Sequence, residues 1–193
     1  MILASKSPRR KEILENLGIN IEIIVPDIEE ISDKKEIAEK IADIALKKAK
    51  KVGEVHKKEY ITAADTVVVC NNEILGKPKN KQEAYEMLKK LSGKTHEVIT
   101  GFAFININSK IEITNYEKSL VTFKELSESD IVWYLDSKEP FDKAGAYGIQ
   151  GKGALFIKKI EGDFFSVMGF PAYKFIEEIK KVMNIEIKEI LEL

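Results

Sequence analysis

Apolar and polar residues follow one another along the chain in two periods, one typical of strands and the other typical of helices. Short apolar runs predict strands at residues 1–4, 20–25 and 60–70. Apolar positions three and four residues apart predict helices within residues 8–17, 37–49 and 80–91. Strands and helices that alternate in this way indicate an α/β fold.

Two long stretches rich in β-branched residues follow. They cover residues 95–107 and 110–123, and Asn108-Ser109 between them predicts a hairpin. Ser127 and Asp130 have the spacing that opens a helix. The second half of the chain therefore continues the mixed α/β pattern.

A glycine-rich polar loop at residues 142–153 precedes the C-terminal elements and is long enough to line a site. Apolar runs at 155–160 and 164–168, divided by a turn, predict short strands, and a helix is expected after Pro171. No repeat, low-complexity tract or linker divides the chain. We predict a single domain over residues 1–193, with any two lobes interwoven.

Composition and charge narrow the classes of protein. Lys and Arg (31) nearly balance Asp and Glu (32), and a net charge of −1 gives no broad basic field for nucleic acid. No apolar run approaches the ~18 residues that span a bilayer, and no signal core opens the chain. Cys70 is alone, which excludes an internal disulfide and suggests a buried thiol in a reducing compartment. We expect a cytoplasmic protein that binds neither membrane nor nucleic acid.

The start of the first helix is suited to anion binding. The segment from Ser5 to Arg10, SKSPRR, joins a strand to this helix, with Ser7 expected as the N-cap and Pro8 at the first helical position. Anions bind at helix N-termini, and arginine adds bidentate recognition of phosphate. The alternative is a capped helix with two solvated arginines.

Asp65 interrupts a strand that is otherwise apolar, ITAADTVVVC at residues 61–70. An unpaired charge at such a position is costly. The carboxylate is therefore expected to meet a metal, a cation or a catalytic water, and a purely structural ion pair is the competing interpretation. Thr66 beside it points to the opposite face if the strand is regular, whereas a bulge or a strand end would bring both side chains into the site.

Four further polar residues carry little information by themselves. Lys77 follows a strand end, and Lys48 lies on a lysine-rich helix, so solvated lysines are the alternative for both. Glu30 belongs to an acidic cluster that is either solvated surface or a ligand for a hard cation. Gln150, in the glycine-rich loop, both donates and accepts hydrogen bonds, which suits recognition of a base edge. A plain solvated connection is the alternative for that loop.

Other features of the sequence are excluded as sites. Residues 92–95, SGKT, match the end of a phosphate-binding P-loop, but the earlier glycine would fall at Leu88, inside a predicted helix. His56 and His96 are isolated, which leaves no support for a zinc site or a Ser-His-Asp site. Trp133 lies on an apolar helix face and is expected in the core.

Five motifs occur in order along the chain: LASKSPRR at 3–10, ADTVV at 64–68, GKP at 76–78, LSGKTHEV at 91–98 and DKAGAYGIQG at 142–151. Taken together, they closely resemble the Maf family of nucleoside triphosphate pyrophosphatases. The resemblance covers essentially the whole chain. It implies an α/β, Maf/inosine-triphosphatase-like fold with a twisted mixed β-sheet, flanking helices, two lobes around a central cleft and commonly a homodimer.

The same resemblance implies roles for individual residues. Asp65 would be the proton acceptor, with Lys48 and Lys77 as catalytic cations, although Lys47 adjoins Lys48 and leaves that match open. Glu30 and Asp65 would hold a divalent metal, Mg²⁺ or alternatively Mn²⁺. The residues expected to bind the nucleoside triphosphate are Ser5, Arg9, Arg10, Thr66 and Gln150.

The loop YGIQG at 147–151 resembles the branch of the family that hydrolyses dTTP and UTP. We expect a house-cleaning enzyme that cleaves these nucleotides, or modified pyrimidine nucleotides, between the α- and β-phosphates to monophosphate and pyrophosphate. Asp65 would activate water for attack on the α-phosphorus, directly or through Mg²⁺. The rivals are a pyrophosphatase that prefers 7-methyl-GTP, a non-catalytic nucleotide-binding regulator of cell division, and a nucleic-acid-binding protein, against which the near-neutral charge argues.

Overall fold

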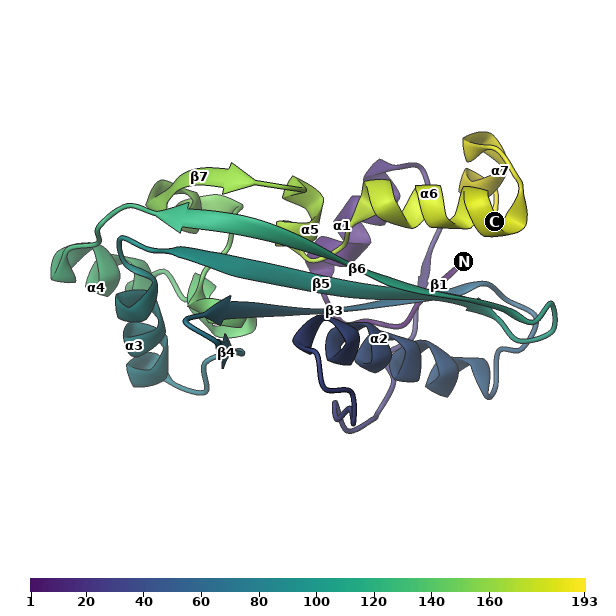
Figure 1. The fold of residues 1–193 in the computed structure, drawn as a ribbon, viewed down its shortest axis with the longest axis horizontal. Coiled ribbons are helices and arrows are strands. Elements are labelled where there is room, and N and C mark those ends of the chain that lie inside the picture. Colours follow the sequence, from purple (N-terminus) through teal and green to yellow (C-terminus); the bar gives the residue numbers. More distant parts are fainter. The chain divides into compact units, whose positions relative to one another are not determined.

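The short apolar runs of the sequence form one mixed sheet, and the amphipathic stretches form helices that flank it (Figure 1). The computed structural model describes residues 1–193. The strands are β1 (Ile2–Leu3), β2 (Glu22–Ile23), β3 (Ile61–Cys70), β4 (Glu73–Leu75), β5 (Thr95–Asn106), β6 (Ile111–Phe123) and β7 (Ile157–Glu161). The helices are α1 (Pro8–Asn16), α2 (Ile37–Gly53), α3 (Lys81–Leu91), α4 (Glu128–Asp136), α5 (Phe164–Met168), α6 (Ala172–Met183) and α7 (Ile187–Leu191), with 3₁₀ turns η1 (Glu139–Asp142), η2 (Ala144–Ala146) and η3 (Gly151–Phe156). None of these helices has both the length and the apolar composition that a membrane span requires.

The seven strands follow the order β2-β1-β3-β5-β6-β7, and β4 pairs with β3 outside this path. β1 is parallel to both β2 and β3, whereas β4 is antiparallel to β3 and β7 is antiparallel to β6. The parallel register sets Ile2 beside Ile61 and Leu3 beside Thr62. This architecture confirms the predicted α/β class with a mixed sheet and flanking helices.

The chain divides into two compact units, each built from segments that are far apart in sequence. The first unit comprises Met1–Asp65, Thr100–Glu117 and Gly169–Leu193, and the second comprises Thr66–Ile99 and Lys118–Met168. Strands β3, β5 and β6 contribute residues to both units. Each unit has its own core and its own share of the predicted site residues.

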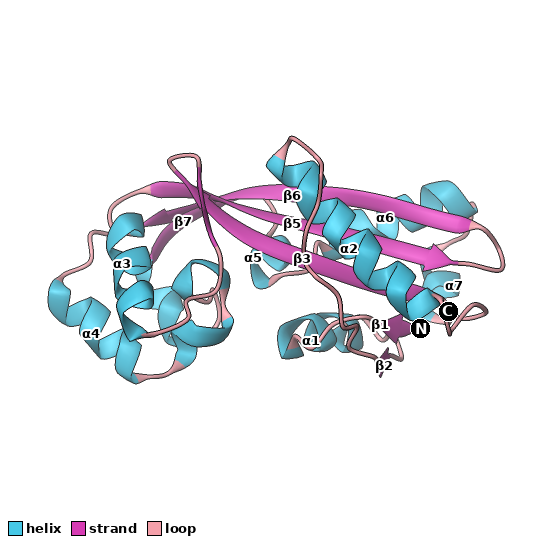
Figure 2. Cartoon of the chain, turned by 90° about the horizontal axis from the view of Figure 1, so that it is seen from below, coloured by secondary structure: helices cyan, strands magenta, loops and turns pink.

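In the first unit, alternate residues of β5 face two different helices. Ala103 and Ile105 belong to an apolar cluster with α2. Phe102 and Phe104 make edge-to-face contacts with Phe175 of α6, at centroid distances of 5.6 and 5.7 Å. Because successive strand residues point to opposite faces, α2 and α6 pack on opposite sides of the sheet, as Figures 1 and 2 show.

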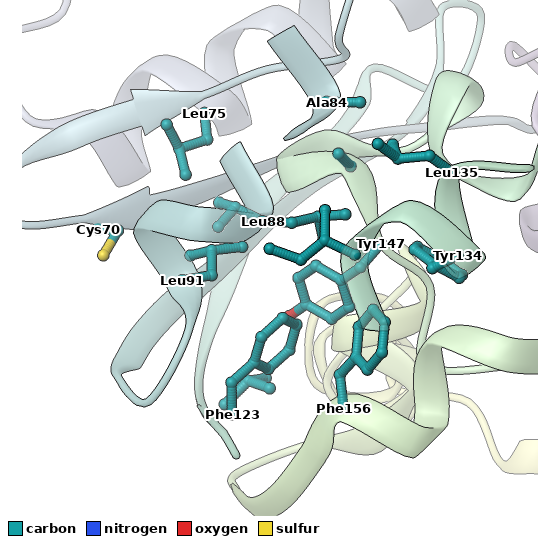
Figure 3. Close-up of a cluster of buried hydrophobic side chains, with 14 of the residues drawn as sticks. Cys70, Leu75, Ala84, Leu88, Leu91, Phe123, Tyr134, Leu135, Tyr147 and Phe156 are labelled. Carbon is teal, nitrogen blue, oxygen red and sulfur yellow. The ribbon is translucent and has the colours of Figure 1, made fainter. Parts of the chain in front are cut away.

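In the second unit, aromatic rings and aliphatic side chains form one core beneath α3 and α4. Figure 3 shows Phe123, Tyr147 and Phe156 close to one another and to Leu88 of α3. Cys70 is a free, buried thiol in the same cluster, as its place in an apolar strand predicts. The loop that carries Gln150 begins in this core, since Tyr147 is part of it.

Two local predictions are wrong, and a third is confirmed only in part. Trp133 is 46% exposed instead of lying in the core, and the ammonium of Lys152 is 5.7 Å from its ring centroid. Residues 164–168 form helix α5 instead of a strand, because the Asp163 carboxylate accepts the N–H groups of the second and third residues of α5 at 3.1 and 2.9 Å. The strand expected over residues 20–25 is only two residues long and exposed.

Candidate active site

An ion-pair cluster of three residues lies in the first unit. Lys48 of α2 places its Nζ 2.7 Å from Asp65 Oδ1 and 2.6 Å from Glu30 Oε1. The side chains of Lys48 and Asp65 are 10% and 15% exposed, whereas that of Glu30 is 59% exposed. The cluster therefore extends from the edge of the core to solvent, where a ligand or a water molecule can reach it.

The position of Lys48 follows from the way α2 packs on the sheet. Its turn of α2 also carries Ala45 and Ala49, which are fully buried, so the lysine stem lies on the helix face turned to the sheet. Close packing needs Gly101 on β5, because a Cβ there would lie only 2.5 Å from the backbone N of Ala42. The helix thus holds the lysine against the strand that carries the acid.

The structure also separates the two neighbouring lysines of α2. Lys47 pairs with Asp43 at 3.0 Å and donates to the carbonyl of Ile31 at 2.8 Å. Lys48, not Lys47, meets the predicted proton acceptor. Lys47 instead fixes the backbone immediately after Glu30, a supporting contact that the sequence analysis did not identify.

The loop between β1 and α1, together with Arg10 at the start of α1, forms a cluster of hydrogen-bonding groups in the same unit, here called the Ser5–Arg10 seat. The Ser5 hydroxyl oxygen accepts the N–H of Ser7 at 3.2 Å and Nη1 of Arg10 at 3.0 Å. Both of its acceptor positions are then used, so the hydroxyl can offer its hydrogen to a ligand. Ser7 occupies the N-cap and Pro8 the first helical position, as predicted, but the Ser7 side chain makes no capping bond, which corrects its expected role.

Arg10 is held in place by protein groups on two sides. Besides Ser5, its Nε donates to the carbonyl of Gly169 at 2.8 Å. Burial is the main cause that lowers the pKa of Arg10 below its ordinary value; the charge of Asp65 opposes this shift, and the charge of Arg9 adds to it. The ordinary value is so high that the guanidinium remains protonated at neutral pH. Gly169 was missed because nothing in its local sequence indicates a partner near the N-terminus.

These groups make a compact charged region in the first unit. Arg9, Arg10 and Lys48 carry positive charge, and Glu30 and Asp65 carry negative charge. The excess of one positive charge, together with the positive end of α1, favours an anionic ligand. Phosphate oxygens match both the guanidinium groups and the Ser5 hydroxyl hydrogen.

The remaining predicted residues, Thr66, Lys77 and Gln150, belong to the second unit. Thr66 and Gln150 are partly buried, and Lys77 is exposed. The N–H of Gly145 donates to the carbonyl of Gly76 at 3.0 Å, so the loop that carries Lys77 is bonded to the segment that leads to Gln150. The sequence motifs at 76–78 and 142–151 thus meet within this unit.

Glu30 and Asp65 are the residues predicted to hold a metal. Both place an oxygen within hydrogen-bonding distance of the same Lys48 ammonium, so these two hard oxygen donors are close to each other. Asp65 uses Oδ1 in this contact. Mg²⁺ is commonly bound through one or two carboxylates together with substrate phosphates, so the donor set fits such an ion. No group of three or more His, Cys, Asp or Glu side chains forms a cage by itself.

The family model described as Maf-like protein matches residues 1–182. The dTTP/UTP pyrophosphatase of Fusobacterium nucleatum subsp. nucleatum is 53% identical over 182 residues, covering 94% of this chain and 95% of that protein. Proteins of the same name from Alkaliphilus oremlandii (51% identity, 90% and 91% coverage) and Bacillus anthracis (49%, 97% and 97%) are similarly close. The solved structure of the Staphylococcus aureus Ham1 protein has a TM-score of 0.47 and 12% identity, covering 63% of this chain and 70% of that chain.

The fold and the site define an α/β protein in which an acidic, lysine-linked cluster lies in the same unit as a basic helix start. The sequence comparisons then give the family: the chain belongs to the Maf family. The resemblance seen in the five sequence motifs is thereby confirmed.

Proposed function

We propose that this chain is a nucleoside triphosphate pyrophosphatase that hydrolyses dTTP and UTP to nucleoside monophosphate and pyrophosphate. The observation that carries the proposal is the ion-paired Lys48–Asp65–Glu30 cluster, in the same unit as the Ser5–Arg10 seat. Its relatives named dTTP/UTP pyrophosphatase support the choice of substrate.

In this proposal Asp65 acts as the general base. Its Oδ2 takes a proton from water as the water oxygen forms a bond to the α-phosphorus. The bond between the α-phosphorus and the bridging oxygen breaks, and pyrophosphate leaves with the electron pair. Lys48, 2.7 Å from Oδ1, orients the carboxylate and stabilises its negative charge.

The basic groups would bind the phosphates. Arg9, Arg10 and the Ser5 hydroxyl are suited to hold phosphate oxygens, because charge-assisted hydrogen bonds stabilise the charge that spreads over them in phosphoryl transfer. Lys77 is assigned to the departing pyrophosphate, and Thr66 and Gln150 to the nucleoside, on the strength of the family motifs that contain them.

A divalent cation, Mg²⁺ or Mn²⁺, would be held by Asp65 and Glu30 together with the phosphates, and would supply neutralisation of the triphosphate charge. Adding the metal is expected to raise turnover, which a comparison of Mg²⁺, Mn²⁺ and a chelator measures directly.

A purely structural ion pair is the competing explanation of Asp65. Such a pair is expected to be enclosed and to have its remaining oxygens satisfied by the protein. Here Glu30 is largely exposed, and the Asp65 side chain is itself 15% exposed. These features favour a carboxylate available for chemistry.

The test is product analysis with dTTP, UTP, CTP and 7-methyl-GTP in the presence of Mg²⁺, Mn²⁺ or a chelator. We expect monophosphate and pyrophosphate from dTTP and UTP. Selective hydrolysis of 7-methyl-GTP would replace the substrate assignment. Nucleotide-dependent thermal stabilisation without pyrophosphate release would favour a non-catalytic nucleotide-binding regulator of cell division.

We also infer, from the family resemblance, that the chain works in the cytoplasm and as a homodimer. Light scattering at several concentrations tests the dimer, with a mass of twice 21.9 kDa expected. A monomer mass throughout the range would contradict it.

A further inference from the structure

A buried histidine in the second unit contacts the segment that carries Gln150. The His96 side chain, on β5, is 2% exposed, and its Nε2 lies 2.8 Å from the Tyr147 hydroxyl. The two rings meet edge to face at a centroid distance of 5.4 Å, and Phe123 packs against both. His96 belongs to the 91–98 motif, to which neither the sequence analysis nor the proposed reaction assigns a role.

The hydrogen bond between His96 and Tyr147 joins two neutral groups. Burial lowers the pKa of His96 to about 4 and raises that of Tyr147 above its ordinary value. Nδ1 of His96 is buried without a partner. If the Tyr147 hydroxyl donates to Nε2, only the N–H at Nδ1 lacks an acceptor; the other tautomer would leave both a tyrosine hydrogen and a histidine lone pair unsatisfied.

A half-satisfied histidine in an apolar core is unfavourable if the core needs only volume. An apolar ring of similar size would fill the same space without an unpaired nitrogen. The bond from His96 to the hydroxyl of Tyr147 is therefore the feature that distinguishes this side chain from a core filler.

Tyr147 directly precedes a short closed loop. The N–H of Gly148 donates to the Tyr134 hydroxyl at 3.3 Å. The backbones of Gly148 and Gly153 touch, because a Cβ on Gly153 would lie only 2.4 Å from the Gly148 carbonyl oxygen. Gln150 lies between these two glycines, so the loop is closed around it.

The far side of the loop is fixed as well. The N–H of Lys152 donates to both carboxylate oxygens of Glu139, at 3.2 and 3.1 Å. Gly151 has a φ of +73°, which a glycine adopts without strain, and its Cα faces the same carboxylate. The loop that carries Gln150 is thus held by contacts of the residues before and after Gln150, and His96 adds a contact from the buried core.

We propose that His96 is a positioning residue for nucleotide selection: through the Tyr147 hydroxyl it fixes the loop in which Gln150 presents its amide to a pyrimidine base. This inference rests on the proposed function, because it takes the base as the ligand of Gln150. A residue that only fills space in the core acts through the volume of its ring. The proposed role of His96 in nucleotide selection depends instead on the hydrogen-bonding atom Nε2.

Two substitutions of His96 separate these roles. In His96→Gln, an amide nitrogen or oxygen lies close to the position of Nε2. In His96→Asn, the amide group lies close to the position of Nδ1, and the side chain is too short to reach Tyr147. Both introduce the same chemical group and remove the ring. Tyr147→Phe removes the hydroxyl and keeps the ring, and Val98→Ala, also on β5 and in the same apolar cluster, is the control for lost packing.

The measurement is kcat and KM for dTTP, UTP and CTP, with amide hydrogen exchange of residues 143–153 in the same variants. For His96→Asn and Tyr147→Phe we expect KM for dTTP and UTP to rise about 10-fold, because the loss of one hydrogen bond corresponds to a change of about that size. We also expect the preference for these nucleotides over CTP to shrink and amide hydrogen exchange in the loop to become faster. His96→Gln is expected within about threefold of the parent protein, and Val98→Ala is expected to lower stability without altering the preference.

Equal behaviour of His96→Asn and His96→Gln in both measurements would overturn the proposal, as would a loss that follows thermal stability alone across all four variants. A parent protein that turns over neither dTTP nor UTP would instead refute the proposed function. The exchange data would then still show whether His96 fixes the loop, so the two failures are distinguishable.

Discussion

The two units hold their polar groups by opposite means. In the first unit, Lys48, Asp65 and Glu30 are charged, paired and partly open to solvent. In the second, His96 and Tyr147 are neutral, hydrogen-bonded and buried. Charged groups that act on a ligand need a side open to that ligand, and pairing with opposite charges limits the cost of burying the rest of the side chain. Neutral hydrogen bonds can be buried and are suited to fixing shape.

This difference leads to different expected failures. Changes in the charged cluster of the first unit are expected to alter turnover while the fold persists. Changes in the neutral His96–Tyr147 pair of the second unit are expected to alter the stability of the protein, the pH dependence of that stability, and the choice of nucleotide. Variants in the two units therefore test the comparison separately.

The largest effect is expected for Asp65→Asn, which keeps the shape of the side chain and removes its charge. Loss of the general base predicts a fall in kcat of about 10²-fold or more, with nucleotide binding largely retained. Asp43→Asn is the matched control, since Asp43 is also ion-paired with a lysine of α2. Steady-state kinetics and calorimetric titration measure the two quantities, and an unchanged kcat would refute the assigned role.

The next effect concerns the pH dependence of stability. The pKa of His96 is lowered from 6.5 to about 4 in the folded chain. The unfolded chain therefore binds a proton that the folded chain excludes as the pH falls through this window. The free energy of unfolding is therefore unaffected by His96 above about pH 6.5. It decreases by roughly 3 kcal/mol as the pH falls to about 4.

Denaturant unfolding at about pH 7 and about pH 4, in the parent protein and in His96→Gln, isolates this contribution, because the other titrating groups are common to both. The parent protein is expected to lose more stability than the variant. Equal losses would show that His96 is not held neutral by burial, and the contrast between the two units would weaken.

Lys48→Met is expected to reduce kcat about 10- to 100-fold, since a charge-assisted hydrogen bond contributes about 1.5–3 kcal/mol. Methionine keeps most of the aliphatic stem and removes the ammonium that links Asp65 and Glu30. Lys47→Met is the control on the adjacent residue, and we expect a much smaller change. A larger loss for Lys47→Met would reverse the assignment of the two lysines.

The smallest effect is expected for Ser127→Ala in the second unit. The Ser127 hydroxyl accepts the N–H of Asp130 at 3.1 Å and caps α4. Its removal should lower the free energy of unfolding by about 1 kcal/mol and leave the preference among nucleotides unchanged. Thermal unfolding and the nucleotide panel together test this, and an altered preference would mean that stability and selection are not separable here.

Local patterns in the sequence predicted much of the fold. The apolar face of residues 37–49 became α2, and Ser127 with Asp130 opened α4 as a capping box. Trp133 was misplaced because its apolar character predicts burial, whereas its position on α4 faces solvent. The helix at 164–168 was missed because its start depends on the capping carboxylate of Asp163. The segment is too short to show the spacing of apolar residues that is typical of a helix.

The candidate site was less predictable, because its contacts join residues that are distant in sequence. Asp65 was recognisable as an acid in an apolar strand, but its partner Lys48 is 17 residues away on another element. The bond from Arg10 to Gly169 spans 159 residues and leaves no local trace. His96 looked isolated for the same reason, since Tyr147 lies 51 residues further on.

The most direct test of the central claim is to follow the oxygen of the attacking water. Hydrolysis of UTP in water enriched in oxygen-18, followed by mass spectrometry of both products, shows which phosphorus is attacked. If Asp65 directs water to the α-phosphorus, the label appears in uridine monophosphate and the pyrophosphate remains unlabelled. Label in the pyrophosphate, or release of orthophosphate as the first product, would contradict the account.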